Sequence, residues 1–481
     1  MRRVSFRLLL ASLGLLLSGC LVGPNYKRPP VDSPTAFRNQ PAPEAVSIAD
    51  LPWWQVFDDP TLQDLIKTAL ANNRDLRVAV SRVEQARQIA AQAHAQYLPQ
   101  VGYEVGVGEG QNDEFGTITA TNGAAGAIIG ALQATWTADV WGQIRRSNEY
   151  ALAVYLATEQ GRRGALLSLV TTVAQAYFEL LDLDLRLQIA RSNVDSFQGS
   201  LDIFEQRLNG GTASRLETSR ARAALSSVAA NIPDLERQIA IQENELRLLL
   251  GTTPGPIPRK GTILEQKLPP AVPAGLPSTL LERRPDILAA ENTVRAANAQ
   301  VGIATANLFP QLSLTALLGR GSSPLEAIVL GRANIWNASA MLTGPIYQGG
   351  ALRARKRQAI AAWEQTRSQY EQTVLSAFRD VSNALVTREK LEAVRTRQIE
   401  SVSAYEEAVT VSQQRYAAGK SSYYEVLEAQ QELYPAQNAL ALTELNRRLA
   451  IVQLYQALGG GWKLSDAQWS EPVSAAPSTT P

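Results

Sequence analysis

Cysteine and histidine are nearly absent from this chain, which contains one of each among 481 residues. A single cysteine cannot form a disulfide within the chain, and one Cys with one His cannot supply the ligands of a structural zinc site. A catalytic relay that needs two histidines is excluded for the same reason. Aromatic residues are also sparse, at 6% of the composition, although Trp and Tyr together outnumber Phe.

An excess of either charge is missing too, because 46 Lys and Arg side chains oppose 45 Asp and Glu side chains. A general nucleic-acid-binding protein needs a marked basic excess, so this class of protein is disfavoured. What the chain does have is length. With 481 residues and 45% hydrophobic content, it can bury a large core and form two or three domains.

The N-terminus has the pattern of a signal peptide, which we assign to residues 1–19. Three arginines precede a ten-residue apolar run, Leu8–Leu17, that is too short to span a bilayer. The run ends in Leu17-Ser18-Gly19-Cys20, which resembles a bacterial lipobox. This motif predicts that Cys20 is lipidated and becomes the mature N-terminus. An ordinary signal peptide followed by a chance cysteine is the alternative.

The residues after Cys20 predict where the lipid anchor resides. Leu21 stands where an aspartate would commonly retain a lipoprotein at the inner membrane, so the outer membrane is favoured. Six prolines between residues 21 and 50 predict an extended tether. A covalent lipid on Cys20 is the only cofactor that we expect.

The rest of the chain is an internal duplication. At an offset of 211 residues, eight of 26 ungapped positions are identical, ending with Pro99-Gln100 opposite Pro310-Gln311. From Arg145, opposite Arg353, the offset becomes 208 and holds for more than 100 residues. A repeat of this length is too long for a solenoid and predicts one domain duplicated once.

Both halves predict the same order of elements. A helix (61–96 or 285–307) precedes two alternating segments, a very long helix (144–208 or 352–416) and a returning helix (214–250 or 422–458). Apolar residues along the long helices repeat at spacings of three and four, which is typical of a left-handed supercoiled seam. A helix of this length extends about 95 Å. A rod-like coiled coil fits the periodicity equally well.

Four segments of about ten residues alternate between apolar residues and small or polar ones. They lie near residues 101–108, 132–140, 312–318 and 336–343. A membrane β-strand needs roughly this length, and a soluble antiparallel sheet is the alternative. Four strands cannot close a barrel and open edges are not tolerated in lipid, so several chains would have to combine their strands.

Longer motifs run through the whole mature chain. They are Trp53-Trp54, Phe57-Asp58-Asp59-Pro60, Asn72-Asn73-Arg74-Asp75-Leu76, Gly275-Leu276-Pro277-Ser278, Leu281-Glu282-Arg283-Arg284-Pro285-Asp286-Ile287, Leu308-Phe309-Pro310 and Tyr455-Gln456-Ala457-Leu458-Gly459-Gly460-Gly461-Trp462. With these motifs the chain resembles the outer-membrane factors of the TolC family. It is most similar to the lipidated, OprM-like channels of tripartite efflux systems of the RND type.

The resemblance implies an α+β membrane protein with an internally duplicated, TolC-like fold. Three identical chains would form a 12-stranded β-barrel, four strands from each, continued by a long α-helical coiled-coil barrel with an equatorial collar. The expected segments are a signal peptide (1–19), a lipid-anchored tether and collar (20–60), a first repeat (61–260, hairpin about 100–140), a linker and collar (261–283), a second repeat (284–462, hairpin about 310–346) and a flexible tail (463–481).

The implied function is passive export of small molecules or drugs through the outer membrane of a bacterial cell. The implied partners are two further copies of the chain, a periplasmic adaptor (membrane fusion protein), an inner-membrane pump of the RND type and outer-membrane lipid, with no nucleic acid. A type I secretion exit duct and a lipid-anchored coiled-coil scaffold without a pore are the alternatives.

Two glycine-containing turns join the paired helices at matching points of the repeat. Arg207, Gly211 and Ser214 recur as Arg415, Gly419 and Ser422. Glycine at a helix end supplies left-handed geometry, which explains part of the recurrence. The resemblance implies that these turns form the periplasmic tip, where the adaptor binds and the pore closes. The gate candidates are Lys420, Ser421, Tyr423, Tyr424 and Glu425, with packing as the alternative role of the tyrosines.

Other residues are predicted to lie at the lipid boundary. Trp136, Trp141 and Trp336 are expected there, with core packing as the alternative. Basic residues follow the last strand of each half and are expected to meet headgroup phosphates, or else to form a solvated face. They are Arg145, Arg146, Arg353, Arg355, Lys356 and Arg357. The loops 109–126 and 319–333 are expected to face outside.

An enzyme is the least favoured class, and we predict neither catalytic residues nor a metal site. The only histidine, His94, lies in an Ala-rich helical stretch, and no strand–turn nucleophile motif surrounds any serine. Gly106-Val107-Gly108-Glu109-Gly110 lies in a predicted hairpin with no helix after it, so it is not a nucleotide-binding loop.

Overall fold

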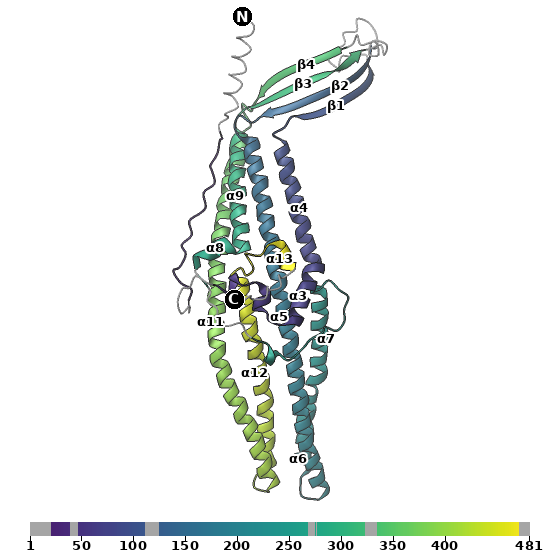
Figure 1. Ribbon diagram of the computed structural model, residues 1–481, viewed down its shortest axis with the longest axis vertical. Coiled ribbons are helices and arrows are strands. Elements are labelled where there is room, and N and C mark those ends of the chain that lie inside the picture. Colours follow the sequence, from purple (N-terminus) through teal and green to yellow (C-terminus); the bar gives the residue numbers. More distant parts are fainter. Residues whose placement is uncertain are drawn as a thin grey trace, which may run out of the picture. The chain divides into compact units, whose positions relative to one another are not determined.

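The computed structural model describes residues 21–38, 47–110, 125–267, 275, 277–322 and 334–470 (Figure 1). The predicted signal peptide, Cys20 and most of the two long loops lie outside these residues. The first half contains η1 (Ile48–Asp50), α2 (Trp53–Val56), α3 (Pro60–Asn72), α4 (Arg74–Ala95), β1 (Gln100–Gly110), β2 (Ala125–Ala138), α5 (Gln143–Asn209), α6 (Arg215–Ala229), α7 (Asn231–Leu249) and η2 (Ile263–Glu265). The second half contains η3 (Pro277–Thr279), α8 (Leu280–Arg283), α9 (Pro285–Ala306), β3 (Gln311–Ser322), β4 (Asn334–Thr343), α11 (Ala351–Ala417), α12 (Tyr423–Ala457) and α13 (Asp466–Ser470).

The four strands and two long helices lie where the sequence predicts them. The chain divides into two compact units. The sheet unit comprises the described residues of 1–30, 82–159 and 289–371. The helical unit comprises those of 31–81, 160–288 and 372–481.

The sheet unit contains one antiparallel sheet in the order β1-β2-β3-β4 (Figure 1). Its register places Tyr103 opposite Leu132, Leu132 opposite Leu318, and Leu318 opposite Trp336. Residues directly opposite share a face, so the alternation of all four strands combines into one apolar face. Tyr103, Leu318 and Trp336 are 82%, 67% and 78% exposed, so the described residues leave this face uncovered.

Residues 22–25 are held in the sheet unit by Arg146, which is only 2% exposed. Its guanidinium donates to the carbonyl oxygens of Val22 and Gly23, both at 3.3 Å, and to Asn25 Oδ1 at 2.8 Å. A Cβ on Gly302 would lie 2.7 Å from Arg146 Cδ, so the absence of a side chain there makes room for the arginine. The prediction that Arg146 faces lipid headgroups is therefore wrong.

Residues 24–28 continue along α9 and are not a loose tether. Asn298 Nδ2 donates to the Pro24 carbonyl oxygen at 3.0 Å. Glu291 accepts a hydrogen bond from the Tyr26 hydroxyl at 3.1 Å and forms an ion pair with Arg28 at 2.9 Å. The chain that follows Cys20 is thus bound along its own second repeat.

The helical unit is built from two helical hairpins, α5 with α6 and α7, and α11 with α12 (Figure 1). The predicted seam of α5 is buried, with Ala190, Phe197, Leu201 and Phe204 between 0% and 5% exposed. Among the described helices, α5 alone is long and apolar enough to cross a membrane, but 67% of its apolar window is buried. We therefore interpret that stretch as a core helix.

Two predicted helices are interrupted. The helix expected at 61–96 breaks at Asn73, whose Oδ1 accepts from the Leu76 amide and whose Nδ2 donates to the Leu249 carbonyl, both at 2.9 Å. The returning helix expected at 214–250 breaks at Ala230. Pro233 lacks the amide hydrogen that would bond to the Ala229 carbonyl, which explains this break.

The segment expected to be a flexible tail from residue 463 differs from the prediction over its first residues. Residues 466–470 form α13, and Trp469 is 6% exposed. Asp466 accepts a hydrogen bond from Arg162 at 2.8 Å. Residues 471–481 lie outside the described part of the chain.

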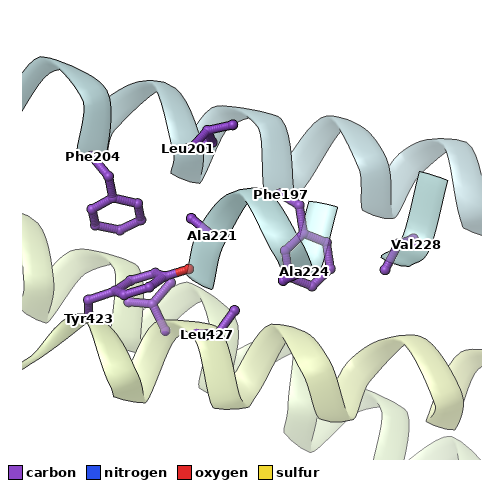
Figure 2. Close-up of a cluster of buried hydrophobic side chains, with 9 residues drawn as sticks. Phe197, Leu201, Phe204, Ala221, Ala224, Val228, Tyr423 and Leu427 are labelled. Atoms are coloured by element: carbon purple, nitrogen blue, oxygen red, sulfur yellow. The ribbon is translucent and has the colours of Figure 1, made fainter. Parts of the chain in front are cut away.

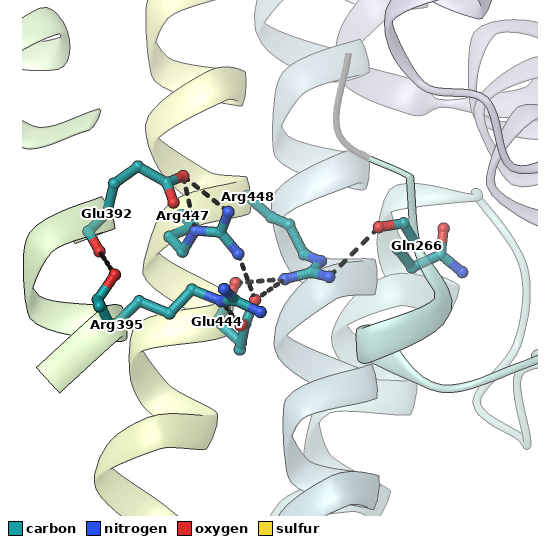
Figure 3. A network of polar contacts seen from close by, with 7 residues as sticks. Gln266, Glu392, Arg395, Glu444, Arg447 and Arg448 are labelled. Atoms are coloured by element: carbon teal, nitrogen blue, oxygen red, sulfur yellow. Dashed lines mark hydrogen bonds and ion pairs between the residues drawn. The ribbon is translucent and has the colours of Figure 1, made fainter. Parts of the chain in front are cut away.

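A polar network around Glu444 connects α11, α12 and the linker that follows η2 (Figure 3). The Glu444 carboxylate accepts from Arg395 and, at 2.7 and 2.8 Å, from Arg447 and Arg448. Arg448 also donates to the Gln266 carbonyl at 3.3 Å. Burial alone would raise the pKa of Glu444, but the hydrogen bonds and charges of the three arginines lower it to about 2.

The same linker reaches the start of α3. Gln266 Nε2 donates to Asp59 Oδ2 at 2.7 Å, and the buried Tyr177 hydroxyl donates to the same oxygen at 2.9 Å. Asp59 Oδ1 accepts from the Thr61 amide at 2.7 Å and so begins α3. One connected set of polar groups therefore joins both repeats in the helical unit.

The depressed pKa of Glu444 predicts a pH dependence of stability. The ionised carboxylate stabilises the fold above its ordinary pKa of 4.5, and this contribution is lost as the pH falls toward about 2. Glu444→Gln leaves three arginines without their carboxylate and should cost about 3–5 kcal/mol near neutral pH. The melting temperatures of wild type and variant should converge between pH 4.5 and 2, and a difference that stays constant over this range would contradict the assignment.

Candidate functional site

The first inter-helical turn of the repeat is closed by backbone hydrogen bonds and a capping box. Gly211 has φ +72°, and the Thr212 amide donates to the Arg207 carbonyl at 2.8 Å. Ser214 begins α6, because its hydroxyl accepts from the Glu217 amide at 3.3 Å while the Glu217 carboxylate accepts from the Ser214 amide at 2.7 Å.

The second turn has the same backbone geometry with different side-chain contacts. Gly419 has φ +67°, and the Lys420 amide donates to the Arg415 carbonyl at 2.8 Å. Ser422 precedes α12 without a side-chain capping bond. The Arg415 guanidinium lies 3.7 Å from the Glu425 carboxylate. The recurring glycine therefore gives both long helices the same backbone ending, while the Arg and Ser side chains make different contacts.

Beside the two turns, apolar residues from three helices form one tip cluster (Figure 2). Its members come from α5, α6 and α12, and they are Phe197, Leu201, Phe204, Ala221, Ala224, Val228, Tyr423, Val426 and Leu427. Tyr416 of α11 packs against it. The ring centroids of Phe204 and Tyr423 are 3.9 Å apart, and the Arg207 guanidinium lies 4.2 Å from the centre of the Tyr416 ring. Both helical hairpins are thus held together at their turns.

The structure separates the five gate candidates. Tyr423 is 3% exposed within the tip cluster, so it packs and does not line a surface of this chain. Burial, followed by the charges of Tyr416 and Glu217, raises its pKa to about 12. Lys420, Tyr424 and Glu425 are exposed, and Ser421 is half-buried. These four remain gate candidates.

Sequence reasoning missed Leu216, an exposed apolar residue that is the repeat equivalent of the gate candidate Tyr424. Leu216 and Tyr424 are separated by the repeat offset of 208, and each occupies the second position of its returning helix. Each is 59% exposed. The offset and the position after the capping serine were the signals that could have found Leu216.

The three predicted boundary tryptophans have different environments. Trp336 is 78% exposed on the apolar face of the sheet. Trp136, on the same face, donates its indole hydrogen to the Tyr97 carbonyl at 3.0 Å. Trp141 follows the sheet, stacks on Phe309 at 4.7 Å and donates to the Pro310 carbonyl at 2.8 Å. These contacts favour packing as the role of Trp141.

No described residue forms a recognisable catalytic arrangement with His94, which is exposed near the end of α4 and contacts Tyr97 edge-on at 5.4 Å. Within the described ranges, no group of three or more His, Cys, Asp or Glu side chains is placed to hold a metal ion. Cys20, the predicted lipidation site, lies outside the described residues.

Comparison with known proteins places these features in a family. The chain matches the family described as outer membrane efflux protein over residues 65–252 and 276–460. It is 32% identical to the cation efflux system protein CusC of Escherichia coli O6:H1, over 95% of this chain and 99% of the relative. It is also 32% identical to the toluene efflux pump outer membrane protein TtgC of Pseudomonas putida, over 97% of each chain.

Solved structures have the same fold. The outer-membrane channel OprN superposes with a TM-score of 0.85 at 31% identity, covering 92% of this chain and all of that one.

The glycines of the two turns should differ in the stability that each loses on substitution by alanine. Gly211 and Gly419 have positive φ and open space where a Cβ would lie, so Ala should cost about 1 kcal/mol at either site through the backbone alone. Gly210 lacks positive φ, and its added Cβ would make ordinary contacts at 3.6 Å, so Gly210→Ala should be neutral. Hydrogen exchange of the Thr212 amide should accelerate about fivefold in Gly211→Ala. Equal acceleration in Gly210→Ala would refute the backbone explanation.

Proposed function

The chain belongs to the outer membrane efflux protein family, and we propose that it forms a trimeric exit duct for small molecules. Membership places it in the outer membrane as the outer-membrane component of a multi-part efflux system. The trimer, the duct and the partners are the proposal that the following observations support.

The observation that carries the proposal is the four-stranded sheet with two unpaired edges. β1 and β4 each pair on one side only, and the sheet presents an uncovered apolar face. In hydrocarbon, an unpaired backbone edge costs several kcal/mol for each unsatisfied group, so the edges must meet partners. Three copies joined from β4 to β1 would give 12 strands and leave no edge.

The helices that follow each strand pair would continue the duct. Each chain contributes α5 and α11 with their returning helices, so three chains supply a ring of helical hairpins. The linker near Gln266 and the segments around η1 and α13 would form the collar around that ring. The family is one of outer-membrane efflux proteins, and on that basis we assign the chain passive transport without enzyme activity.

Small molecules are the cargo class that the relatives support. CusC is named for cation efflux and TtgC for toluene efflux, and both are 32% identical to this chain. Sequence identity to these two relatives therefore does not distinguish cations from toluene as the cargo. In the proposal, an inner-membrane pump of the RND type selects the cargo and supplies energy, while the duct sets only the width and polarity of the exit path.

The tip is the proposed binding surface for the periplasmic adaptor. Leu216 and Tyr424 present equivalent apolar side chains beside Arg207, Gly211 and Ser214, and beside Arg415, Gly419 and Ser422. A trimer would repeat each contact three times and offer six similar binding points. Lys420, Ser421 and Glu425 would lie nearest the closing point of the pore.

Cys20 is the proposed acceptor of the lipid anchor. The lipobox carries this assignment, and Leu21, directly after it, is fixed near the sheet because the Val22 amide donates to the Trp141 carbonyl at 3.3 Å. An acylated mature N-terminus would therefore start beside the proposed membrane sheet.

Intact-mass analysis tests the lipidation of Cys20. A mature chain that starts elsewhere or carries no acyl mass would refute it.

Cross-linking of the sheet edges tests the trimer. Gly106→Cys in β1, combined in turn with Asn337→Cys, Ser339→Cys or Met341→Cys in β4, should give covalent trimers on oxidation in membranes from at least one pair. Each single-cysteine variant is the matched control and should give none. Failure of all pairs, or monomeric protein in the membrane, would contradict the barrel.

Planar-bilayer recording tests the pore. Absence of current from verified trimers would favour the scaffold alternative over a duct.

Charge substitution of the exposed pair tests the adaptor surface. Leu216→Asp with Tyr424→Asp should reduce adaptor binding by at least about tenfold, because the exposed apolar contact of each repeat becomes charged. Ile241→Asp with Val394→Asp changes two other exposed apolar residues by the same charge and should leave binding intact. Surface plasmon resonance with the purified adaptor measures both, and equal losses would place the adaptor elsewhere.

A further inference from the structure

The two connections from sheet to long helix are equivalent in the repeat but differ in net charge, since the first is neutral and the second is positive. At the offset of 208, residues 139–149 of the first half correspond to residues 347–357 of the second. The first stretch contains two arginines and two acids. The second contains four cations and no acid. The duplication therefore provides an internal comparison at one structural position.

In the first connection, the acids neutralise the arginines within the chain. Asp139 accepts from the Ile144 amide at 2.8 Å and the Arg145 amide at 3.0 Å, and its carboxylate pairs with the Arg145 guanidinium at 3.1 Å. Glu149 pairs with Arg146 at 2.7 Å. This connection needs no external counter-charge.

In the second connection, both acids are replaced. Tyr347 stands at the position of Asp139, and Arg357 stands at the position of Glu149. Arg353, Arg355 and Arg357 are exposed, and Lys356 is half-buried. Across the described residues, no hydrogen bond or ion pair involves any of these four side chains. We call Arg353, Arg355, Lys356 and Arg357 the junction patch.

Apolar side chains flank the junction patch on its strand side. Ile346 is fully exposed and Tyr347 is 87% exposed, which makes them the two most exposed large apolar residues of the described chain. Before them, β4 carries Trp336 and Leu342 on the uncovered apolar face, 78% and 67% exposed. The chain thus passes from a long apolar face, through two exposed apolar residues, to four unpaired cations within 22 residues.

We propose that the junction patch binds the phosphate groups of anionic phospholipids in the periplasmic leaflet of the outer membrane. The apolar side chains end where hydrocarbon would end, and the cations follow where headgroup phosphates would lie. Basic side chains next to an apolar anchor gain binding energy from such phosphates. The inference rests on the proposed placement of the sheet in the membrane, and it does not require the adaptor or the gate.

Native mass spectrometry of the full-length protein tests the proposal. Wild type, equilibrated with equal amounts of phosphatidylglycerol and phosphatidylethanolamine, should retain phosphatidylglycerol preferentially. Replacing the four junction-patch residues with Gln should weaken its retention on the order of 10- to 100-fold. The charge-keeping variant Arg353→Lys, Arg355→Lys, Arg357→Lys should retain the lipid.

A control removes the same charge from the helical unit. Arg191, Arg222, Arg237 and Arg397 are between 59% and 81% exposed, and their replacement with Gln should leave lipid retention unchanged. Equal retention by the junction-patch variant and wild type, or equal loss in patch and control variants, would overturn the proposal.

A second measurement uses only the wild type, so that the proposal can be tested even if the junction-patch variant does not assemble. Phosphatidylglycerol retained per wild-type trimer should fall about tenfold between roughly 0.05 and 0.5 M salt, because headgroup contacts at a surface are screened. A salt-independent count would overturn the proposal. Gel analysis of the same samples reports the trimer separately, so loss of lipid binding and failure of the proposed assembly are distinguishable.

Discussion

Backbone hydrogen bonding in hydrocarbon is the constraint on which the rest of this structure depends. A four-stranded antiparallel sheet satisfies the inner sides of β1 and β4 and both sides of β2 and β3, and it leaves two rows of polar groups without partners. Water can satisfy such rows, but lipid cannot. The register makes a purely aqueous sheet a poor solution, because it places one large apolar residue from each strand (Tyr103, Leu132, Leu318 and Trp336) on one uncovered face. Outer-membrane residence and the proposed assembly from several copies are linked by this one constraint.

Duplication lets the chain keep one backbone plan while its side chains diverge. Both inter-helical turns use a left-handed glycine and the same amide-to-carbonyl bond, from Thr212 to Arg207 and from Lys420 to Arg415. A capping box then closes the first turn, whereas Arg415 and Glu425 approach each other at the second. The connections from sheet to helix diverge further, since Asp139 and Glu149 correspond to Tyr347 and Arg357. The shared geometry is structural, and the differences are where each half can acquire its own contacts.

Local periodicity made much of the fold predictable. Alternation with a period of two located the strands, and spacings of three and four located the long helices and the buried seam that contains Phe197 and Phe204. The errors came from residues whose partners are distant in sequence. Asn73 interrupts a helix because its side chain binds the Leu249 carbonyl, and Arg146 is buried because residues 22–25 surround it. Tyr423 was a gate candidate because it follows the second turn, and only its packing against Phe204 identifies it as a core residue. The lipid and adaptor sites depend on groups outside the chain.

The contacts of Arg146 with residues 22–25 also have a consequence for the order in which the chain folds. Gly23 lies so close to Gly302 that a Cβ on Gly23 would be 2.6 Å from the Gly302 Cα, and Pro24 is held by Asn298. These partners are separated by more than 270 residues, so the slot exists only after α9 has been synthesised and placed beside the start of α5. Residues 23 and 24 are therefore synthesised long before Gly302 and Asn298, against which they lie. Until α9 is in place these residues lack part of their binding partners, and the chain that follows Cys20 cannot take up its bound conformation.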